Sequence, residues 1–356
     1  MKKLYSLIAS FSVALTFAQA GAPAAPYYNG FNWNQTGTAL KNALAIKITS
    51  THTNFLSYGE VWDALKFTDQ DPDNSNNVLL VYGSNSTTMS LPKSATCGNG
   101  NSSENCGVIR WNREHTFAQA LGNPSLGQTG PGADAHHLRA CTYALNEQRA
   151  NRKYAAGIGI AATVGVNYYP GDEWKGDVAR MMMYMYLRYG SQCLPTAVGT
   201  GATVASDANM INLFLQWNAE DPVSQYEDNR NTYLGSTAAY AQRNRNPFID
   251  NPYLATLIWG GQVAENRWPF LSTQDFDVLA SVAVYPNPTN NHRINIDSDV
   301  VLDEIQLINI NGQLMQQIKN PSAQGNTYSV ENLPSGFYIL KLSSENQTTT
   351  KKVIVN

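Results

Sequence analysis

Charged side chains are scarce in this sequence. Asp, Glu, Lys and Arg make up only 14% of its 356 residues, and the formal net charge is −3. A chain with this balance cannot bind polyanions through its overall charge, so any nucleic-acid binding must rest on a local basic surface. Long apolar runs are also missing, since no stretch of about eighteen apolar residues follows the N-terminus. We therefore expect no transmembrane segment in the mature chain, and about two domains at this length.

The N-terminus has the pattern of a signal peptide. Lys2 and Lys3 provide a positive start, and the apolar stretch from Leu4 to Phe17 is too short to span a bilayer. The small residues of Ala18-Gln19-Ala20 then offer a cleavage site. We predict that residues 1–20 are removed and that the mature protein is secreted, either released or attached to the outer cell surface.

Cysteine is rare, with four residues in the whole chain. Their spacing does not suggest a zinc ribbon, and exported chains oxidise such thiols. Cys97 and Cys106 flank a Gly/Asn/Ser-rich loop and are expected to form a local disulfide, which leaves Cys141 to pair with Cys193. Four cysteines allow three connectivities, so this pairing is a hypothesis.

The first two thirds of the chain mix helical and strand patterns. Apolar residues recur at i+3 and i+4 within 176–189, which predicts a helix whose methionines pack in the core. Further expected elements are helices over 39–49, 140–154 and 210–218 and strands over 61–68, 78–82 and 108–111. The fold class predicted for this part, residues 21–275, is α+β.

From near Phe276 the pattern changes to short strands. Asn311-Gly312 is a strong two-residue hairpin signal, and a sandwich-like, all-β domain is expected over residues 280–356. This region resembles the C-terminal sorting domain of type IX secretion in Tyr285-Pro286-Asn287-Pro288, Gly312, Gly336-Phe337-Tyr338 and Lys351-Lys352-Val353-Ile354. The resemblance implies an address that an outer-membrane secretion machinery reads. The alternative is a carbohydrate- or surface-binding β-sandwich.

Chemically active side chains concentrate in fewer than forty residues, which hold three of the five histidines. The segments are Arg113-Glu114-His115-Thr116, Asp134-Ala135-His136-His137-Leu138-Arg139 and Asn146-Glu147-Gln148-Arg149-Ala150-Asn151. They combine a base for water, oxygen ligands for a hard cation and guanidinium groups for phosphate, which together suit phosphodiester cleavage.

Each candidate has a specific role in that chemistry. His115 is the candidate general base, because a neutral imidazole can take a proton from water near pH 7. Glu114 and Asn146 offer oxygens to Mg²⁺, with Ca²⁺ or Mn²⁺ as alternatives. Adjacent strand residues point to opposite faces, so Glu114 and His115 can share a site only at a strand end. Arg149 and Arg139 are the candidates for phosphate contact.

Two further groups of side chains in this region are weaker candidates for the site. Arg152 and Lys153 are weaker candidates for phosphate, since charged helix faces are usually only solvated. Asp134, His136 and His137 raise a rival zinc site. However, the two histidines are consecutive, and an extended strand would separate their side chains.

The same segments resemble the bacterial secreted or periplasmic endonuclease I family, which carries a ββα-metal (His-Me finger) nuclease site. Further matching motifs are Lys175-Gly176-Asp177-Val178-Ala179-Arg180, Asp221-Pro222-Val223-Ser224 and Arg243-Asn244-Arg245-Asn246-Pro247-Phe248-Ile249-Asp250. The resemblance implies His115 as general base, Glu114 and Asn146 as ligands of one divalent cation, and DNA, often with RNA, as substrate cut to 5′-phosphate products.

One departure from the family is that no Arg or Lys lies between His115 and Arg139. Some relatives place a phosphate-binding arginine in this loop, so the phosphate contact must come from elsewhere. The expected protein is a secreted, monomeric, metal-dependent endonuclease. The rival functions are an inactive surface-displayed nucleic-acid-binding protein and a zinc-dependent hydrolase.

Overall fold

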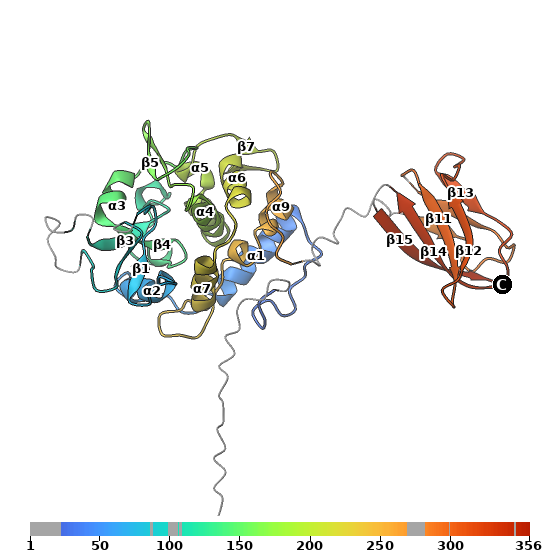
Figure 1. The fold of residues 1–356 in the computed structure, drawn as a ribbon, viewed down its shortest axis with the longest axis horizontal. Helices are drawn as coiled ribbons and strands as arrows, with labels where there is room; N and C mark the ends of the chain where they lie inside the picture. The colour runs from blue at the N-terminus through green and yellow to red at the C-terminus, as the bar shows by residue number, and fades with distance from the viewer. Residues whose placement is uncertain are drawn as a thin grey trace, which may run out of the picture. The chain divides into compact units, whose positions relative to one another are not determined.

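The computed structural model describes residues 23–85, 88–98, 106, 109–268, 282–298, 300–344 and 347–356. The chain divides into two compact units, Met1–Pro269 and Phe270–Asn356 (Figure 1). The expected signal peptide lies outside the described residues. Within the described residues, no helix has both the length and the apolar composition to cross a membrane.

The first unit mixes helices with two-stranded antiparallel sheets. Its helices are α1 (Gly37–Thr51), α2 (Val61–Thr68), α3 (Tyr143–Arg149), α4 (Lys175–Tyr189), α5 (Pro195–Val198), α6 (Asn212–Glu220), α7 (Gln225–Leu234), α8 (Pro247–Asp250) and α9 (Tyr253–Trp259). Its strand pairs are β1 (Asn77–Leu79) with β2 (Ser90–Pro92), β3 (Trp111–His115) with β4 (Leu138–Thr142), β5 (Ala162–Val164) with β6 (Asn167–Tyr169), and β7 (Thr203–Val204) with β8 (Asp207–Ile211). The α+β prediction is confirmed.

Helix α4 is the centre of this unit (Figure 1). Every residue from Gly176 to Leu187 is buried, as expected for a helix that is packed on all sides, here against α1 and α6 among others. Arg180 lies in this interior, and it forms a bidentate ion pair with Glu227 of α7, with N···O distances of 2.6 and 2.7 Å. The predicted helix over 176–189 is confirmed, and its methionines are core residues.

Helix α2 corrects the strand predicted over 61–68. Val61, Ala64, Leu65 and Thr68 are all buried, and they recur at the i, i+3, i+4, i+7 spacing of one helix face. This face packs in a core with Val78, Trp111, Leu138 and Ala140, residues of the two neighbouring strand pairs. The helix therefore packs against the β3–β4 strand pair and stabilises it.

The helix predicted over 140–154 is wrong for its first three and its last five residues. Residues 140–142 belong to β4, all of whose residues are buried, so the strand lacks the alternation that would mark it in the sequence. The helix begins after Thr142, whose side chain accepts a hydrogen bond from the backbone N–H of Leu145 at 3.2 Å. It ends at Arg149 because Ala150 has a φ of 46°.

Other expectations were met in part. Helix α1 confirms the helix predicted over 39–49, and α6 starts two residues after the predicted Met210. Strand β1 covers the start of the predicted strand over 78–82, whereas the strand predicted over 108–111 is β3, which begins only at Trp111.

The disulfide prediction was correct for one pair. Cys97 and Cys106 form a disulfide, whereas Cys141 and Cys193 are both free and buried. Cys141 lies within β4 and its Sγ contacts the carbonyl oxygen of Val81 at 3.4 Å. Both thiols are thus accommodated in the core as small apolar groups.

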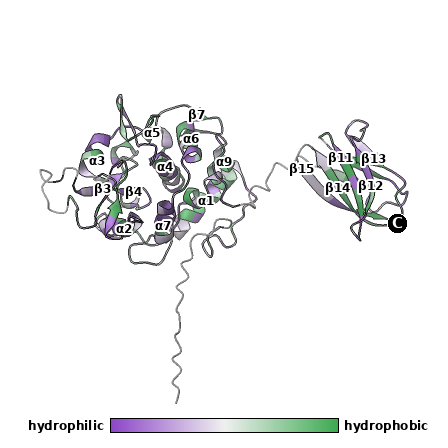
Figure 2. Ribbon diagram, in the orientation of Figure 1, coloured by the Kyte–Doolittle hydropathy of each residue, from purple (hydrophilic) through white to green (hydrophobic). Residues whose placement is uncertain are grey.

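The second unit is all-β, as predicted. A three-stranded sheet orders β13 (Thr327–Val330), β10 (Ile294–Asp297) and β9 (Ala283–Tyr285), and a four-stranded sheet orders β12 (Leu314–Lys319), β11 (Glu304–Asn309), β14 (Gly336–Ser344) and β15 (Gln347–Val355). Alternate residues of β14 are buried, and Figure 2 shows hydrophobic and hydrophilic residues mixed on these strands. The predicted hairpin at Asn311-Gly312 joins β11 to β12.

Candidate active site

The candidate site is built from one continuous ββα segment. Strand β3 pairs with β4 so that Glu114 lies opposite Arg139 and His115 opposite Leu138. His115 is the last residue of β3, and this strand end is the place where adjacent residues can serve one site. Helix α3 follows β4 directly and carries Asn146 and Arg149 back towards the strand end.

A cavity of about 170 Å³ brings most of the candidate residues together. It is lined by Arg113, Glu114, His115, Ala118, Gln119, Asn146, Arg149, Ala150 and Asn151. The predicted base, both predicted metal ligands and one predicted arginine thus surround one space, and Arg139 is not among the lining residues.

The contacts of His115 set its protonation state. Its Nε2 lies 2.9 Å from the carbonyl oxygen of Gly132, and because a carbonyl only accepts, Nε2 carries the proton and Nδ1 keeps its lone pair. The ring stacks on Tyr58 at a centroid distance of 5.5 Å. Burial, together with the neighbouring His137, lowers the pKa of His115 to about 3. A neutral imidazole with one free nitrogen is the form that a general base requires.

Glu114 is a buried carboxylate with donors on one side. The Tyr82 hydroxyl donates to Oε1 at 3.0 Å, and Nη1 of Arg149 lies 3.5 Å from the same oxygen. Burial raises the pKa of Glu114 to about 7, and the charge of Arg149 opposes this rise. A bound cation next to the carboxylate would favour its charged form.

Asn146 is oriented so that its oxygen remains available for another partner. Its Nδ2 donates to Oδ1 of Asn112 at 2.8 Å and makes a longer contact, 3.4 Å, with the carbonyl oxygen of Arg113. With the amide nitrogen engaged, Oδ1 is the atom left for a ligand. Two protein oxygens at one cavity fit a magnesium-like ion, which keeps several waters.

The rival zinc ligands are engaged in the protein interior. The Nε2 of His136 contacts Asn244, the Nε2 of His137 lies 2.7 Å from the carbonyl oxygen of Pro131, and Asp134 accepts from Tyr184 at 2.9 Å. Across the described ranges, no group of three or more His, Cys, Asp or Glu side chains could hold a metal ion. The side chains of His136, His137 and Asp134 are thus held by partners within the protein.

Arg149 lines the cavity, and both of its terminal nitrogens donate to backbone carbonyl oxygens. Nη1 donates to the carbonyl oxygen of His115 at 3.0 Å, and Nη2 donates to that of Thr116 at 2.6 Å. The side chain is 1% exposed. In this arrangement Arg149 fixes the strand end that carries His115, and it neutralises Glu114.

Arg139 lies away from the cavity in a buried ion-pair network. Its Nη1 donates to Asp177 at 2.9 Å, and its Nε lies 3.4 Å from Asp69. Two carboxylates hold this guanidinium in the core, and a phosphate contact would require it to leave them. The geometry gives no support to the predicted phosphate contact of Arg139.

Several residues of the site were not singled out from the sequence. Tyr82 and Tyr58 come from distant segments, and no local signal marks them. Arg113 lines the cavity with its guanidinium 3.4 Å from the ring centroid of Tyr58, and its place two residues before His115 on β3 was a signal that could have found it. Gln119 and Asn151 complete the lining.

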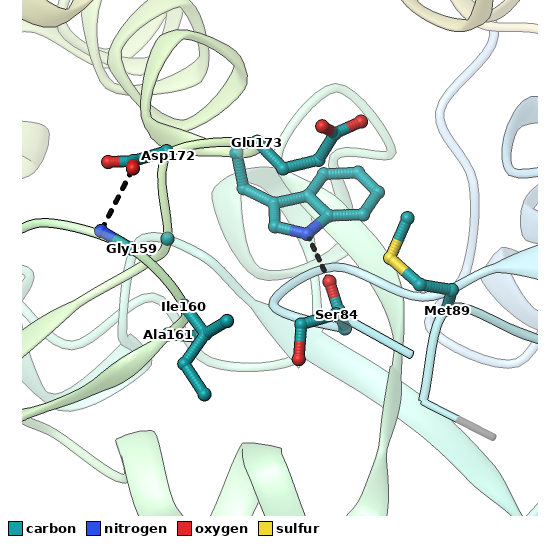
Figure 3. Close-up of a pocket in the computed structure, with 10 residues that line it drawn as sticks. Ser84, Met89, Gly159, Ile160, Ala161, Asp172 and Glu173 are labelled. Atoms are coloured by element: carbon teal, nitrogen blue, oxygen red, sulfur yellow. Dashed lines mark hydrogen bonds between the residues drawn. The ribbon is translucent and has the colours of Figure 1, made fainter. Parts of the chain in front are cut away.

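A larger cavity of about 310 Å³ lies elsewhere in the first unit (Figure 3). Its lining includes Asp172 and Glu173, together with Trp174, whose Nε1 donates to the carbonyl oxygen of Gly83 at 2.9 Å. No histidine or cation lines it, and its carboxylates would repel phosphate. The ββα cavity, although smaller, is the one equipped for phosphodiester chemistry.

Comparison with known protein families shows the family of each part of the chain. The profile of the endonuclease I family matches residues 36–253. The chain belongs to the endonuclease I family. A secretion system C-terminal sorting domain matches residues 283–356. Members of the endonuclease I family are metal-dependent nucleases, and the combination with a sorting domain makes this family member a secreted nuclease that acts on nucleic acid.

Two similar relatives are extracellular ribonucleases. The one from Bacillus subtilis (strain 168) is 41% identical over 254 residues, which cover 67% of this chain and 82% of the relative. The one from Bacillus amyloliquefaciens is 42% identical over 235 residues, 63% of this chain and 75% of the relative. An ulvan lyase from Nonlabens ulvanivorans is 27% identical over 126 residues, 34% of this chain and 23% of the lyase.

Proposed function

We propose that this nuclease is a Mg²⁺-dependent endonuclease that hydrolyses both DNA and RNA with little sequence preference and leaves 5′-phosphate ends. The observation that carries the proposal is that His115, Glu114 and Asn146 line one cavity, while the contact of Nε2 with the carbonyl oxygen of Gly132 leaves Nδ1 of His115 with its lone pair. RNA is included because the names of two relatives describe extracellular ribonucleases.

In the proposed mechanism, Nδ1 of His115 takes the proton from a water molecule as that water attacks phosphorus in line with the departing 3′-oxygen. Glu114 Oε2 and Asn146 Oδ1 would hold the cation. When bound, the cation supplies positive charge to a non-bridging oxygen and to the leaving oxygen. Nε2–H of His115 donates to Gly132, which keeps the ring in the tautomer that can accept at Nδ1.

Arg149 acts in this proposal as a positioning residue. Its hydrogen bonds to the carbonyl oxygens of His115 and Thr116 keep the base at the edge of the cavity, and its charge opposes the rise in the pKa of Glu114 that burial causes. Of the two arginines that line the cavity, Arg113 makes fewer hydrogen bonds to backbone carbonyls than Arg149 does. We therefore assign Arg113 the contact with the scissile phosphate. Arg139 is left out of the machinery, because Asp69 and Asp177 hold it.

The organisation of the chain follows from the same proposal. Residues 1–20 are the signal peptide, residues 21–275 the catalytic domain, and residues 280–356 the domain that the type IX secretion machinery reads. The mature nuclease acts as a monomer at or beyond the cell surface.

The test uses the mature chain on supercoiled plasmid and on RNA whose 2′-hydroxyls are methylated. Since water is the nucleophile, the methylated RNA should be cut and its products should carry 5′-phosphates. EDTA should stop cleavage of both substrates and Mg²⁺ should restore it. His115→Ala should be inactive, whereas the matched control His292→Ala, in the sorting unit, should retain full activity.

Each contrary result has a distinct meaning. Full activity of His115→Ala would refute the base, and activity in EDTA would refute the metal. If 2′-O-methyl RNA resists while plasmid is cut, the RNA reaction uses the 2′-hydroxyl and not water. A wild-type chain that binds nucleic acid without cutting it would favour the non-catalytic alternative.

A further inference from the structure

A third cavity, of about 570 Å³, adjoins the ββα cavity. Its lining consists of Leu121, Ala150, Asn151, Arg152, Lys153, Gly165, Val166 and Asn167. Ala150 and Asn151 line both cavities, so both spaces border the turn that follows helix α3. A nucleic-acid strand bound at the ββα cavity would reach the third cavity by passing this turn.

Hydrogen bonds fix the shape of this third cavity. Ala150 has a φ of 46°, a conformation that L-residues rarely adopt, and this turn directs the following residues along the cavity. The backbone N–H of Tyr168 donates to the carbonyl oxygen of Lys153 at 2.9 Å, which ties the β5–β6 hairpin to the segment that carries the cations. The hydroxyl of Tyr154 then donates to Thr116 at 2.9 Å, next to His115.

The two cations of this cavity have no acidic partner. Arg152 donates to the carbonyl oxygen of Gln148 at 2.7 Å and Lys153 to that of Thr196 at 3.0 Å, and neither forms an ion pair within the described residues. In contrast, Lys41, Lys66 and Lys175 are each neutralised by a carboxylate. Two neighbouring cations that line one cavity without a carboxylate partner can hold an anionic ligand.

The lining also includes apolar side chains. Val166, at the tip of the β5–β6 hairpin, is 84% exposed although it is a valine, and Leu121 is half-buried. A cavity that carries both cations and apolar side chains matches a nucleotide, which presents a phosphate on one side and a sugar and base on the other.

We propose that this cavity, named the flanking subsite, binds the nucleotide next to the scissile phosphate, with Arg152 and Lys153 on its backbone phosphate and Val166 against its sugar or base. The inference rests on the proposed nuclease function. The subsite supplies the phosphate-binding charge that is missing from the loop between His115 and Arg139. It adds affinity for polymeric substrates and leaves the chemical step unchanged.

The test compares a polymer with a minimal substrate, on the mature chain with Mg²⁺. In Arg152→Gln/Lys153→Gln, KM for single-stranded DNA should rise about tenfold. The slope of log(kcat/KM) against log[salt] should fall by about 1.4, which is two lost phosphate contacts on a single strand. Hydrolysis of bis(p-nitrophenyl) phosphate, which is too small to reach the flanking subsite, should not change.

The matched control is Lys66→Gln/Lys93→Gln, which removes two cations that line none of the three cavities. If this pair weakens polymer cleavage as much as the Arg152/Lys153 pair does, the effect is one of overall charge and the flanking subsite is refuted. Equal losses on the polymer and the minimal substrate would also overturn it. Loss of wild-type activity in Mg²⁺ would instead mean that the proposed function has failed.

A second pair of variants keeps the test valid if the first variants do not fold. Because Val166 is exposed, its substitution should not affect stability. Val166→Asp should raise KM for the polymer and Val166→Lys should lower it, each several-fold. The controls Val263→Asp and Val263→Lys, at another exposed valine, should leave this KM unchanged. The same KM for both Val166 variants would refute the subsite.

Discussion

The hydrogen bond between Asn146 and Asn112 offers a direct test of how the site is oriented. Asn146 can present Oδ1 to a cation only while its Nδ2 faces the other way, and the Oδ1 of Asn112, 2.8 Å from that nitrogen, is the acceptor that holds it there. Asn112→Leu keeps a side chain of similar size and removes the acceptor. The carboxamide is then free to turn its nitrogen towards the cation.

The expected loss can be bounded from the geometry. Removal of a group that orients a metal ligand typically weakens metal binding by about 10- to 100-fold, or about 1.4 to 2.7 kcal/mol. The contact of Asn146 with the carbonyl oxygen of Arg113 remains, but at 3.4 Å it is weak. We therefore expect a loss near the lower end, about tenfold. Asn112→Asp keeps an acceptor and should bind the cation at least as well as the wild type.

The assay is the initial rate of plasmid nicking as a function of Mg²⁺ concentration. Asn112→Leu should shift the half-maximal concentration about tenfold upward and reach the wild-type plateau, while His115→Ala should stay inactive at every concentration. Asn209→Leu, at an exposed position of β8, serves as the control for a polar-to-apolar change in a strand. An unchanged midpoint in Asn112→Leu, or a lowered plateau that Mg²⁺ does not rescue, would refute the reasoning.

Three further predictions concern stability. Burial lowers the pKa of His136 to about 4, so between that value and its ordinary 6.5 the unfolded chain binds a proton that the folded chain does not. The free energy of unfolding should therefore fall as the pH drops through this window, by on the order of 3 kcal/mol. In urea unfolding at pH 7 and 4.5, His136→Gln should flatten this pH dependence. Arg230→Met removes the buried partner of Asp69 and should cost about 3–5 kcal/mol by the same measurement, and a loss under 1 kcal/mol would contradict this. Cys97→Ser/Cys106→Ser should cost about 2–3 kcal/mol, the chain-entropy value for so short a loop.

Much of the site could be predicted from the sequence because its chemistry lies in one short segment. Glu114 and His115 are adjacent, and the rule that neighbours on a strand diverge already required a strand end, where the structure places them. Asn146 follows on the next helix. The roles of the arginines could not be predicted from the sequence. Arg149 is buried and donates to the carbonyl oxygens of His115 and Thr116, whereas Arg152 is half-buried and donates to a carbonyl oxygen four residues earlier in the chain, and this difference depends on tertiary contacts.

The errors in the fold also have local causes. Residues 61–68 contain valine, tryptophan, phenylalanine and threonine, which favour strands in isolation, yet burial of one helical face decides the outcome. Strand β4 is buried along its whole length and therefore lacks alternation. In contrast, α4 and the hairpin at Asn311-Gly312 were predictable, because a long apolar period and a specific turn pair leave few alternatives.

Thr142 is both the last residue of β4 and the N-cap of α3. The strand and the helix therefore share one residue, and no spacer separates them. One inserted residue at this junction would rotate the helix by about 100° and turn Asn146 away from Glu114. The loop from Thr116 to His137 is much longer, although the carbonyl oxygen of Gly132 within it must keep its place at His115. Among members of the family, we therefore expect insertions and deletions to be frequent in that loop and rare at the junction, where the distance between the strand and the helix must stay constant.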